Sequence, residues 1–114
     1  MTNCIFCKIV RGEIPSQIVH KDEWVTAFRD IHPQAPIHIL IVSNKHLDGP
    51  LDVTEADAAL MGRVLLVANA IAYKEGFAAN GYRLVANEGK DSNQTVEHLH
   101  FHVIAGRHMG WPPG

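Results

Sequence analysis

The sequence is poor in the features that mark several common classes of protein. No apolar run approaches the about 20 residues that a membrane-spanning helix needs. Two cysteines, Cys4 and Cys7, are too few for a disulfide scaffold. The formal charge is only −2, and the basic residues are scattered from Lys8 to Arg107, whereas nucleic-acid-binding proteins usually gather their positive charge. We therefore expect neither a membrane partner nor a nucleic-acid partner.

The first residues also lack the pattern of an export signal. Asn3, Lys8 and Arg11 interrupt the apolar residues there, which predicts that no signal peptide is present and that the protein is cytoplasmic. In such a reducing compartment, the CxxC spacing of Cys4 and Cys7 indicates either metal binding or redox exchange.

Histidine is the residue that the sequence has in excess. There are 8 histidines in 114 residues, and three of them fall within residues 98–102. The remaining composition, 46% hydrophobic and 19% charged, is typical of a compact globular protein. This length predicts a single domain over residues 1–114 that folds without needing a metal or a disulfide. The histidines are therefore the first place to look for a function.

The apolar periodicity predicts an α+β fold. A short helix is expected over 4–11 and a long one over 54–73, the second beginning with a capping box of Thr54 and Asp57. The expected strands are 18–19, 24–28, 37–42, 82–86 and 96–105. Because most of these strands are neighbours in the sequence, we expect a five-stranded antiparallel sheet with the long helix packed on it.

The last of these strands carries a histidine on every second residue. Alternate side chains of a strand share a face, so we expect His98, His100 and His102 to point one way and the apolar residues between them to point toward the helix. The row of imidazoles has three readings: an exposed polar face, a zinc strand in which two histidines chelate the ion, or a nucleophilic imidazole whose neighbours bind an anion.

The preceding loop favours the third reading. It carries short neutral side chains that can donate hydrogen bonds, and Gly89 lets the backbone approach a ligand. The side chains are those of Asn87, Asn93, Gln94 and Thr95. Such donors suit a phosphate better than a metal, and phosphoryl transfer depends mainly on positioning and charge stabilisation.

Several motifs resemble one known family. His98-Leu99-His100-Phe101-His102-Val103-Ile104 is similar to the signature of the histidine triad (HIT) superfamily. The accompanying matches are Ile5-Phe6, Phe28-Arg29-Asp30-Ile31, Pro33-Gln34-Ala35-Pro36, Gly81-Tyr82-Arg83, Asn87-Glu88-Gly89, Gln94 and the final Trp111-Pro112-Pro113-Gly114. Together they resemble the Hint branch of that superfamily, the purine nucleoside phosphoramidases, over essentially the whole chain.

The resemblance implies a hydrolase that cuts the P–N bond of purine nucleoside 5′-phosphoramidates and needs no cofactor for catalysis. His100 would attack the α-phosphorus and form a covalent nucleotidyl-histidine, with His98 and His102 on either side. His38 would complete the hydrogen-bond chain that fixes the tautomers.

The resemblance also implies the roles of the substrate-binding residues. Asn87, Gln94 and Thr95 would contact phosphate and Asp30 the ribose, although Asp30 also suits a simple turn. The purine wall would consist of Ile5, Phe6, Ile9, Phe28 and Ile31, which periodicity alone assigns to ordinary core. Trp111 would reach the active site of a partner subunit. Asn93 and Thr95 depart from the family's usual glycine and serine, which puts the leaving-group preference in doubt.

Some members of the superfamily bind a structural zinc ion through residues that this chain matches. The matching residues are Cys4, Cys7, His46 and His98, and the alternatives for the cysteines are plain thiols or a redox pair. The resemblance further implies a homodimer with the sheet extended across it. Met61, Leu65 and Leu66, which widen the apolar stripe of the long helix, fit a second subunit.

Two rival functions share these features. A dinucleoside polyphosphate hydrolase of the same superfamily would use the same triad, but the Trp111-Pro112-Pro113-Gly114 end favours the Hint branch. A nucleotide-binding or zinc-stabilised interaction module with vestigial hydrolysis is the other rival. His100 with Asn87 and Gln94 argues against it, because binding alone does not require a nucleophile.

Overall fold

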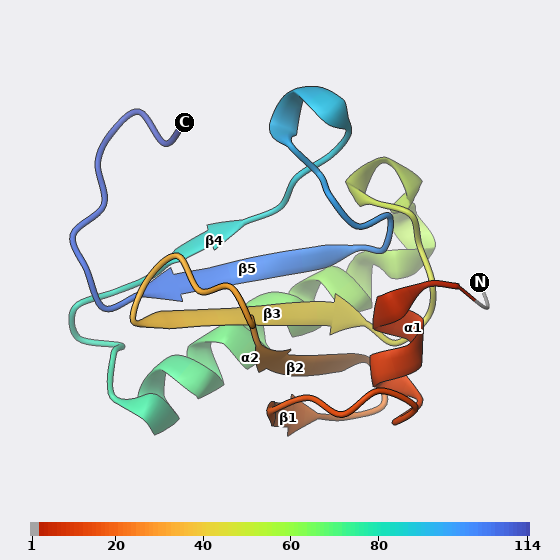
Figure 1. Cartoon of the computed structure of the whole chain (residues 1–114), viewed down its shortest axis with the longest axis horizontal. Helices are drawn as coiled ribbons and strands as arrows, with labels where there is room; N and C mark the ends of the chain where they lie inside the picture. The colour runs from red at the N-terminus through yellow and green to blue at the C-terminus, as the bar shows by residue number, and fades with distance from the viewer. Residues whose placement is uncertain (1–2) are drawn as a thin grey trace.

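Five antiparallel strands form one sheet within residues 3–114, the part of the chain that this computed structural model describes (Figure 1). The strands are β1 (Ile18–Lys21), β2 (Val25–Arg29), β3 (Ile37–Ser43), β4 (Arg83–Val85) and β5 (His100–Ala105). Their order across the sheet is β1-β2-β3-β5-β4, so β3 pairs with both β2 and β5. The predicted fold class, an antiparallel five-stranded sheet with one long and one short helix, is confirmed.

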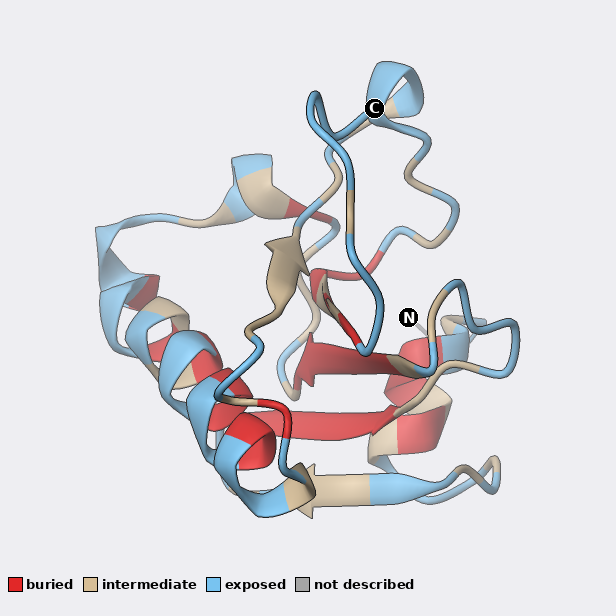
Figure 2. Ribbon diagram, turned by 90° about the vertical axis from the view of Figure 1, so that its left-hand side faces the viewer, coloured by how far each residue is buried: buried red, intermediate tan, exposed pale blue. Residues whose placement is uncertain are grey.

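The two faces of the sheet pack against different helices (Figure 2). Helix α2 (Ala58–Glu75) covers one face, and the short helix α1 (Ile5–Val10) lies against the other. Strand β3 serves both: Ile39 and Ile41 pack with α2, whereas Leu40 and Val42 pack with α1. Because neighbouring residues of a strand point to opposite faces, β3 is buried on both sides.

Helix α2 has the predicted capping box but not the predicted bounds of 54–73, since it runs from Ala58 to Glu75. The capping box of Thr54 and Asp57 is present, although it encloses a 3-10 turn, and the α-helix itself begins at Ala58. Gly76 ends the helix in the left-handed conformation, with φ of 85°. The segment Glu55–Glu75 is long and apolar enough to cross a bilayer by length and composition alone. Since one face of it packs on the sheet, α2 has the contacts of a core helix.

Strand β5 is shorter than predicted, but the His98 ring still lies on the α1 side of the sheet with that of His100, since Phe6 packs edge-on against both rings. The strand begins at His100, and residues 96–98 form a bend. The reason lies in the partner strand: β3 ends at Ser43, and its last residue paired with β5 is Val42, opposite His100. Regular pairing with β3 therefore ends at His100, although the Ser43 N–H still donates to the Leu99 carbonyl over 3.3 Å, and the His98 ring lies against Cys4 and Cys7 at α1.

Candidate active site

A hollow of about 280 Å³ lies between α1, β2 and the start of β5. It brings together nine of the residues predicted for the site: Ile5, Phe6, Ile9, Phe28, Asp30, Ile31, Thr95, His100 and His102. The sequence did not single out seven others that line it, Ile14, Pro15, Ser16, Arg29, His32, Leu40 and Val96. Except for Arg29, which lies within the Phe28-Arg29-Asp30-Ile31 match, these residues carry no motif, and most become neighbours only when α1 is laid across the sheet.

The apolar wall of this hollow is part core and part open surface. Phe6, Ile9 and Phe28 are buried and belong to the cluster under α1. Ile5 and Ile31 are 46% and 84% exposed, although both line the hollow. Two exposed branched side chains at the mouth of an apolar cavity fit the contact surface of a flat ligand better than ordinary core.

His100 is held in one orientation by the backbone. Its Nδ1 lies 2.6 Å from the carbonyl oxygen of His98, so Nδ1–H donates and the lone pair of a neutral ring is left on Nε2. The ring is buried and packs edge-on against Phe6, with the ring centroids 5.1 Å apart. Burial lowers the pKa of His100, although the hydrogen bond to His98 and the charge of Asp30 oppose the shift. The imidazole is therefore unprotonated near neutral pH, which a nucleophile requires.

A second chain of hydrogen bonds orients His102. The Gln34 N–H donates to His38 Nδ1 over 3.0 Å, so a neutral His38 carries its proton on Nε2. That nitrogen lies 2.9 Å from His102 Nδ1, which accepts, and the proton of His102 is left on its Nε2. Burial, followed by the imidazoles of His100 and His38, lowers the pKa of His102 to about 4, with Asp30 opposing. Burial likewise lowers the pKa of His38.

The polar side chains predicted in the loop between β4 and β5 have different surroundings in the structure. Asn93 adopts the left-handed conformation, with φ of 63°. Thr95 lines the hollow, whereas Asn87, Gln94 and Trp111 do not. Gln94 has its amide fully occupied by the backbone: Nε2 donates to the carbonyls of Asp48 and Val96, and Oε1 accepts from the Gly89 N–H. Gln94 is thus placed to hold the loop, not to reach a phosphate.

Trp111 stands outside the body of this chain. Its side chain is 83% exposed, and it follows the segment beyond β5 that carries the chain away from the sheet (Figure 1). The predicted contact of Trp111 with the site of a partner subunit stays a prediction, since a single chain has no partner to offer it.

Four metal-binding side chains converge behind the hollow. One ligand atom from each of Cys4, Cys7, His46 and His98 lies within 4.8 Å of the others. His98 Nδ1 is 3.2 Å from Cys4 Sγ and 3.2 Å from His46 Nδ1, and Cys7 Sγ is 3.3 Å from His46 Nδ1. Ligands about 2.0–2.3 Å from a tetrahedral zinc ion lie about 3.3–3.8 Å from one another. The spacing of the four atoms therefore matches a zinc site.

The outer nitrogens of the two histidines decide whether the group fits a cation. His98 Nε2 lies 2.7 Å from the Ser43 carbonyl oxygen, and His46 Nε2 lies 2.7 Å from Asp48 Oδ1. Both outer nitrogens donate, so both Nδ1 lone pairs point into the group, where they can accept from the thiols of Cys4 and Cys7 or bind a cation. Burial and the adjacent Cys4 raise the pKa of the Cys7 thiol, the opposite of a redox-active thiolate.

Asp30, His38 and His102 form a second group with metal-ligand spacing. Here the positions of the histidine protons argue against a metal. The proton on His38 Nε2 already lies between that nitrogen and His102 Nδ1, in the space that a metal would need. This group does not fit a metal, and its geometry is that of a proton-bearing chain.

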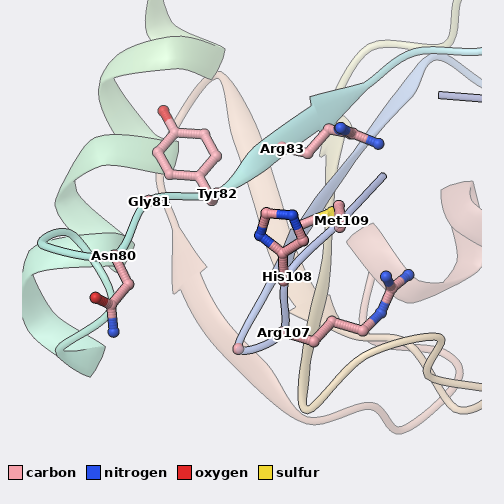
Figure 3. A pocket seen from close by; sticks show the side chains of 8 residues that line it. Asn80, Gly81, Tyr82, Arg83, Arg107, His108 and Met109 are labelled. Atoms are coloured by element: carbon pink, nitrogen blue, oxygen red, sulfur yellow. The ribbon is translucent and has the colours of Figure 1, made fainter. Parts of the chain in front are cut away.

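A larger hollow, of about 570 Å³, lies at the other end of the sheet (Figure 3). It is lined by Asn80, Gly81, Tyr82, Arg83, Gly106, Arg107, His108 and Met109. Arg83 and Arg107 donate to the backbone carbonyls of Gly110 and Gln34, which ties down both guanidinium groups. None of the triad histidines lines it, so we place the chemistry in the smaller hollow.

Comparison with known proteins gives one consistent result. The HIT domain family profile matches residues 11–109. The purine nucleoside phosphoramidase of Escherichia coli K12 is 49% identical over 106 residues, which are 93% of this chain and 89% of that protein. An uncharacterised HIT-like protein of Synechococcus elongatus is 48% identical over 110 residues, 96% of each chain. The crystal structure of a HIT family hydrolase from Legionella pneumophila has a TM-score of 0.96 and 47% identity, covering 98% of this chain and 100% of that one.

Proposed function

This chain belongs to the HIT domain family, and on that premise we propose that it is a hydrolase that cleaves the P–N bond of purine nucleoside 5′-phosphoramidates. The observation that carries the proposal is the orientation of His100, whose Nδ1–H is bound by the His98 carbonyl while its Nε2 is left with a free lone pair. The Escherichia coli relative, which is named a purine nucleoside phosphoramidase, supports the choice of bond.

The first half of the reaction transfers the nucleotide to the protein. His100 Nε2 attacks the α-phosphorus, and the bond from phosphorus to the leaving nitrogen breaks. Because His102 Nδ1 accepts a hydrogen bond from His38, the proton of His102 is on Nε2 and passes to the departing amine. The products of this half are a free amine and a nucleotidyl-His100.

The second half restores the protein. His102 Nε2, now without its proton, takes one from a water molecule whose oxygen attacks the same phosphorus. The bond between phosphorus and His100 breaks, and a nucleoside monophosphate leaves. Both histidines then hold the protons with which they began, so the cycle consumes one water and no other reagent.

The remaining residues of the hollow bind the substrate. The purine lies against the apolar wall, between exposed Ile5 and Ile31 and buried Phe28. The carboxylate of Asp30, which lines the hollow, accepts hydrogen bonds from the ribose hydroxyls. Thr95 and the backbone of its loop bind the phosphate, and Gln94 holds that loop in place.

We further propose that Cys4, Cys7, His46 and His98 hold one zinc ion. The convergent lone pairs and the donor contacts of the outer nitrogens support this. A zinc ion there would supply structural stability, fixing α1 to the segment before β5. His98 is then a metal ligand, and the chemistry is carried out by His100 and His102.

The protein acts as a cytoplasmic homodimer in this proposal. Three apolar side chains of α2 support it, since Leu65 and Leu66 are 51% and 60% exposed and Tyr73 is 78% exposed. The narrow edge strand β4 pairs only with β5 in the described chain, which leaves its other edge open to extend the sheet.

Hydrolysis of adenosine 5′-phosphoramidate tests the function. We expect release of AMP and ammonia, and an adenylyl adduct on His100 when the reaction is quenched in acid-free denaturant and read by mass spectrometry. His100→Ala should bind AMP yet show neither adduct nor turnover. Diadenosine polyphosphate serves as the competing substrate: faster cleavage of it than of the phosphoramidate would transfer the assignment to the rival branch of the family.

A further inference from the structure

The Cys4–Cys7–His46–His98 group, called here the four-ligand group, contacts the proposed nucleotide site through two separate routes. The first runs through His98, which offers Nδ1 to the group and its backbone carbonyl to Nδ1–H of His100, 2.6 Å away. One residue thus belongs to both places, and any shift of its backbone moves the acceptor that orients the nucleophile.

The second route runs through side chains to the loop that carries Thr95. His46 Nε2 donates to Asp48 Oδ1 over 2.7 Å, and the backbone carbonyl of Asp48 accepts from Gln94 Nε2 over 2.8 Å. Gln94 then reaches both ends of the loop, accepting from the Gly89 N–H at 2.8 Å and donating to the Val96 carbonyl at 3.1 Å. Each link is a direct contact, so the route has no gap.

Apart from this route, the loop is tied to the body of the chain at its start, where the Leu51 N–H donates to Glu88 Oε1 over 2.8 Å. Residues 90–93 are exposed, and the loop contains a 3-10 turn over Lys90–Ser92 followed by left-handed Asn93. Within residues 3–114, hydrogen bonds join its two ends through Gln94, by the side-chain contacts above and by the backbone bond from Gln94 N–H to the Gly89 carbonyl. A loop with few buried contacts depends strongly on those that it has.

From these contacts we propose that Asp48 and Gln94 are positioning residues that couple the four-ligand group to the phosphate end of the nucleotide site, so that loading the group with Zn²⁺ tightens the binding of a nucleoside monophosphate. This inference rests on the proposed nucleotide-binding function. Without a cation, only weak thiol hydrogen bonds from Cys4 and Cys7 hold His98 and His46, whereas one ion binds all four side chains together; Asp48 and Gln94 carry that difference in rigidity to the loop.

Hydrogen–deuterium exchange of the loop tests the coupling without using activity. In the wild type, we expect Zn²⁺ to slow exchange of the amides at 89–96 at least about 5-fold relative to chelator-treated protein, while amides of β3 stay unchanged. Gln94→Glu keeps the size of the side chain but loses both Nε2 donors. It should still bind one Zn²⁺ per chain by elemental analysis, yet Zn²⁺ should change loop exchange less than about 2-fold.

Titration calorimetry with AMP measures the same coupling as a change in nucleotide affinity. Zn²⁺ should lower the Kd of the wild type for AMP about 5-fold or more, in the range typical of coupled sites, and should leave the Kd of Gln94→Glu nearly unchanged. Asn80→Asp, which adds the same charge at an exposed site far from the loop, should behave as the wild type. Asp48→Ala should bind Zn²⁺ more weakly and lose the same coupling.

The outcomes separate the two proposals. Equal effects of Zn²⁺ on the wild type and on Gln94→Glu, or no Zn²⁺ bound by the wild type, overturn the coupling and leave the proposed hydrolase intact. Absence of AMP binding in every state, with loop exchange still dependent on Zn²⁺ through Gln94, overturns the nucleotide-binding function while the mechanical link stands.

Discussion

The imidazole of His100 is joined to the backbone of His98 by a 2.6 Å hydrogen bond from Nδ1–H to the carbonyl oxygen. The two histidines, which are two apart in the sequence, therefore have different duties: His98 turns its ring into a zinc-fitting group, and its backbone presents the ring of His100 to the hollow. Strand β5 begins at His100, so His98 lies just before the strand and His100 is its first residue. The start of the strand thus separates the proposed metal ligand from the proposed nucleophile.

The hydrogen-bond chain that orients His102 gives a pair of contrasting variants. His38→Gln keeps a donor near the position of Nε2, whereas His38→Asn does not reach His102. We expect kcat for adenosine 5′-phosphoramidate to fall at least about 10-fold more in His38→Asn than in His38→Gln, since proton transfer to the leaving group depends on the tautomer of His102. Steady-state kinetics checks this, and equal kcat values for the two variants would contradict the chain.

Removal of a thiol should remove the metal. Elemental analysis of the untagged wild type should find one zinc per chain, and Cys7→Ser should have less than about a tenth of that. Loss of the ion should lower Tm by at least about 5 °C, because each kcal/mol lost shifts Tm by several degrees in a domain of this size. His108→Ala, at an exposed histidine outside the four-ligand group, is the control and should keep both its zinc and its Tm.

Asp30 should distinguish nucleotides that have ribose hydroxyls from those that lack them. If its carboxylate binds the ribose hydroxyls, Asp30→Asn should weaken AMP binding about 10-fold and leave binding of 2′,3′-dideoxy-AMP nearly unchanged. Calorimetry with both nucleotides measures the difference. An equal loss for the two ligands would assign Asp30 to its other contacts, the His32 N–H and His38.

The buried histidines predict a loss of stability in mild acid. The pKa of His102 is lowered from 6.5 to about 4 and that of His38 is also lowered, in both cases first by burial. The unfolded chain therefore takes up protons before the folded chain does. The contribution of His102 is fully present above pH 6.5 and is lost as the pH falls toward 4, and His38 acts in the same direction.

Thermal melts between pH 7 and pH 5 measure this effect. Tm of the wild type should fall across that interval, and the fall should be smaller in His102→Asn, which no longer has an imidazole to protonate. His108→Asn, at an exposed position, should follow the wild type. A steeper fall in His102→Asn than in the wild type would reverse the sign that burial of the neutral ring requires.

The exposed apolar face of α2 predicts a dimer that a single charged side chain introduced on that face disrupts. Light scattering should give twice the 12.6 kDa chain mass for the wild type and the single mass for Leu66→Glu. Leu51→Glu places the same charge on a leucine that is 82% exposed but lies outside α2, and should stay dimeric. A monomeric wild type at micromolar concentration would remove the dimer from the proposed function.

Parts of the site could be predicted from the sequence, and each success has a local cause. His100 and His102 alternate with apolar residues, a pattern that places them on one face of a strand whatever the rest of the chain does. Asn93, which stands where the family has glycine, adopts the left-handed backbone that asparagine tolerates better than most residues. That Gln94 holds the loop could not be predicted from its neighbours in the sequence, because its amide bonds to backbone atoms of Asp48, Gly89 and Val96, one of which is 46 residues away.

What the sequence alone determined is the set of local structures: the long helix with its capping box, the strands, and the row of histidines. Spacing and backbone propensity act over a few residues, so they can be read without the fold. Only the tertiary structure decided that Cys4 and His98, 94 positions apart, lie 3.2 Å from each other and that β5 stops short of His98. Those outcomes depend on where α1 lies across the sheet and on where β3 ends. A hydrogen bond needs a donor and an acceptor close together, and a metal site needs all of its ligands, and here these groups come from distant parts of the chain.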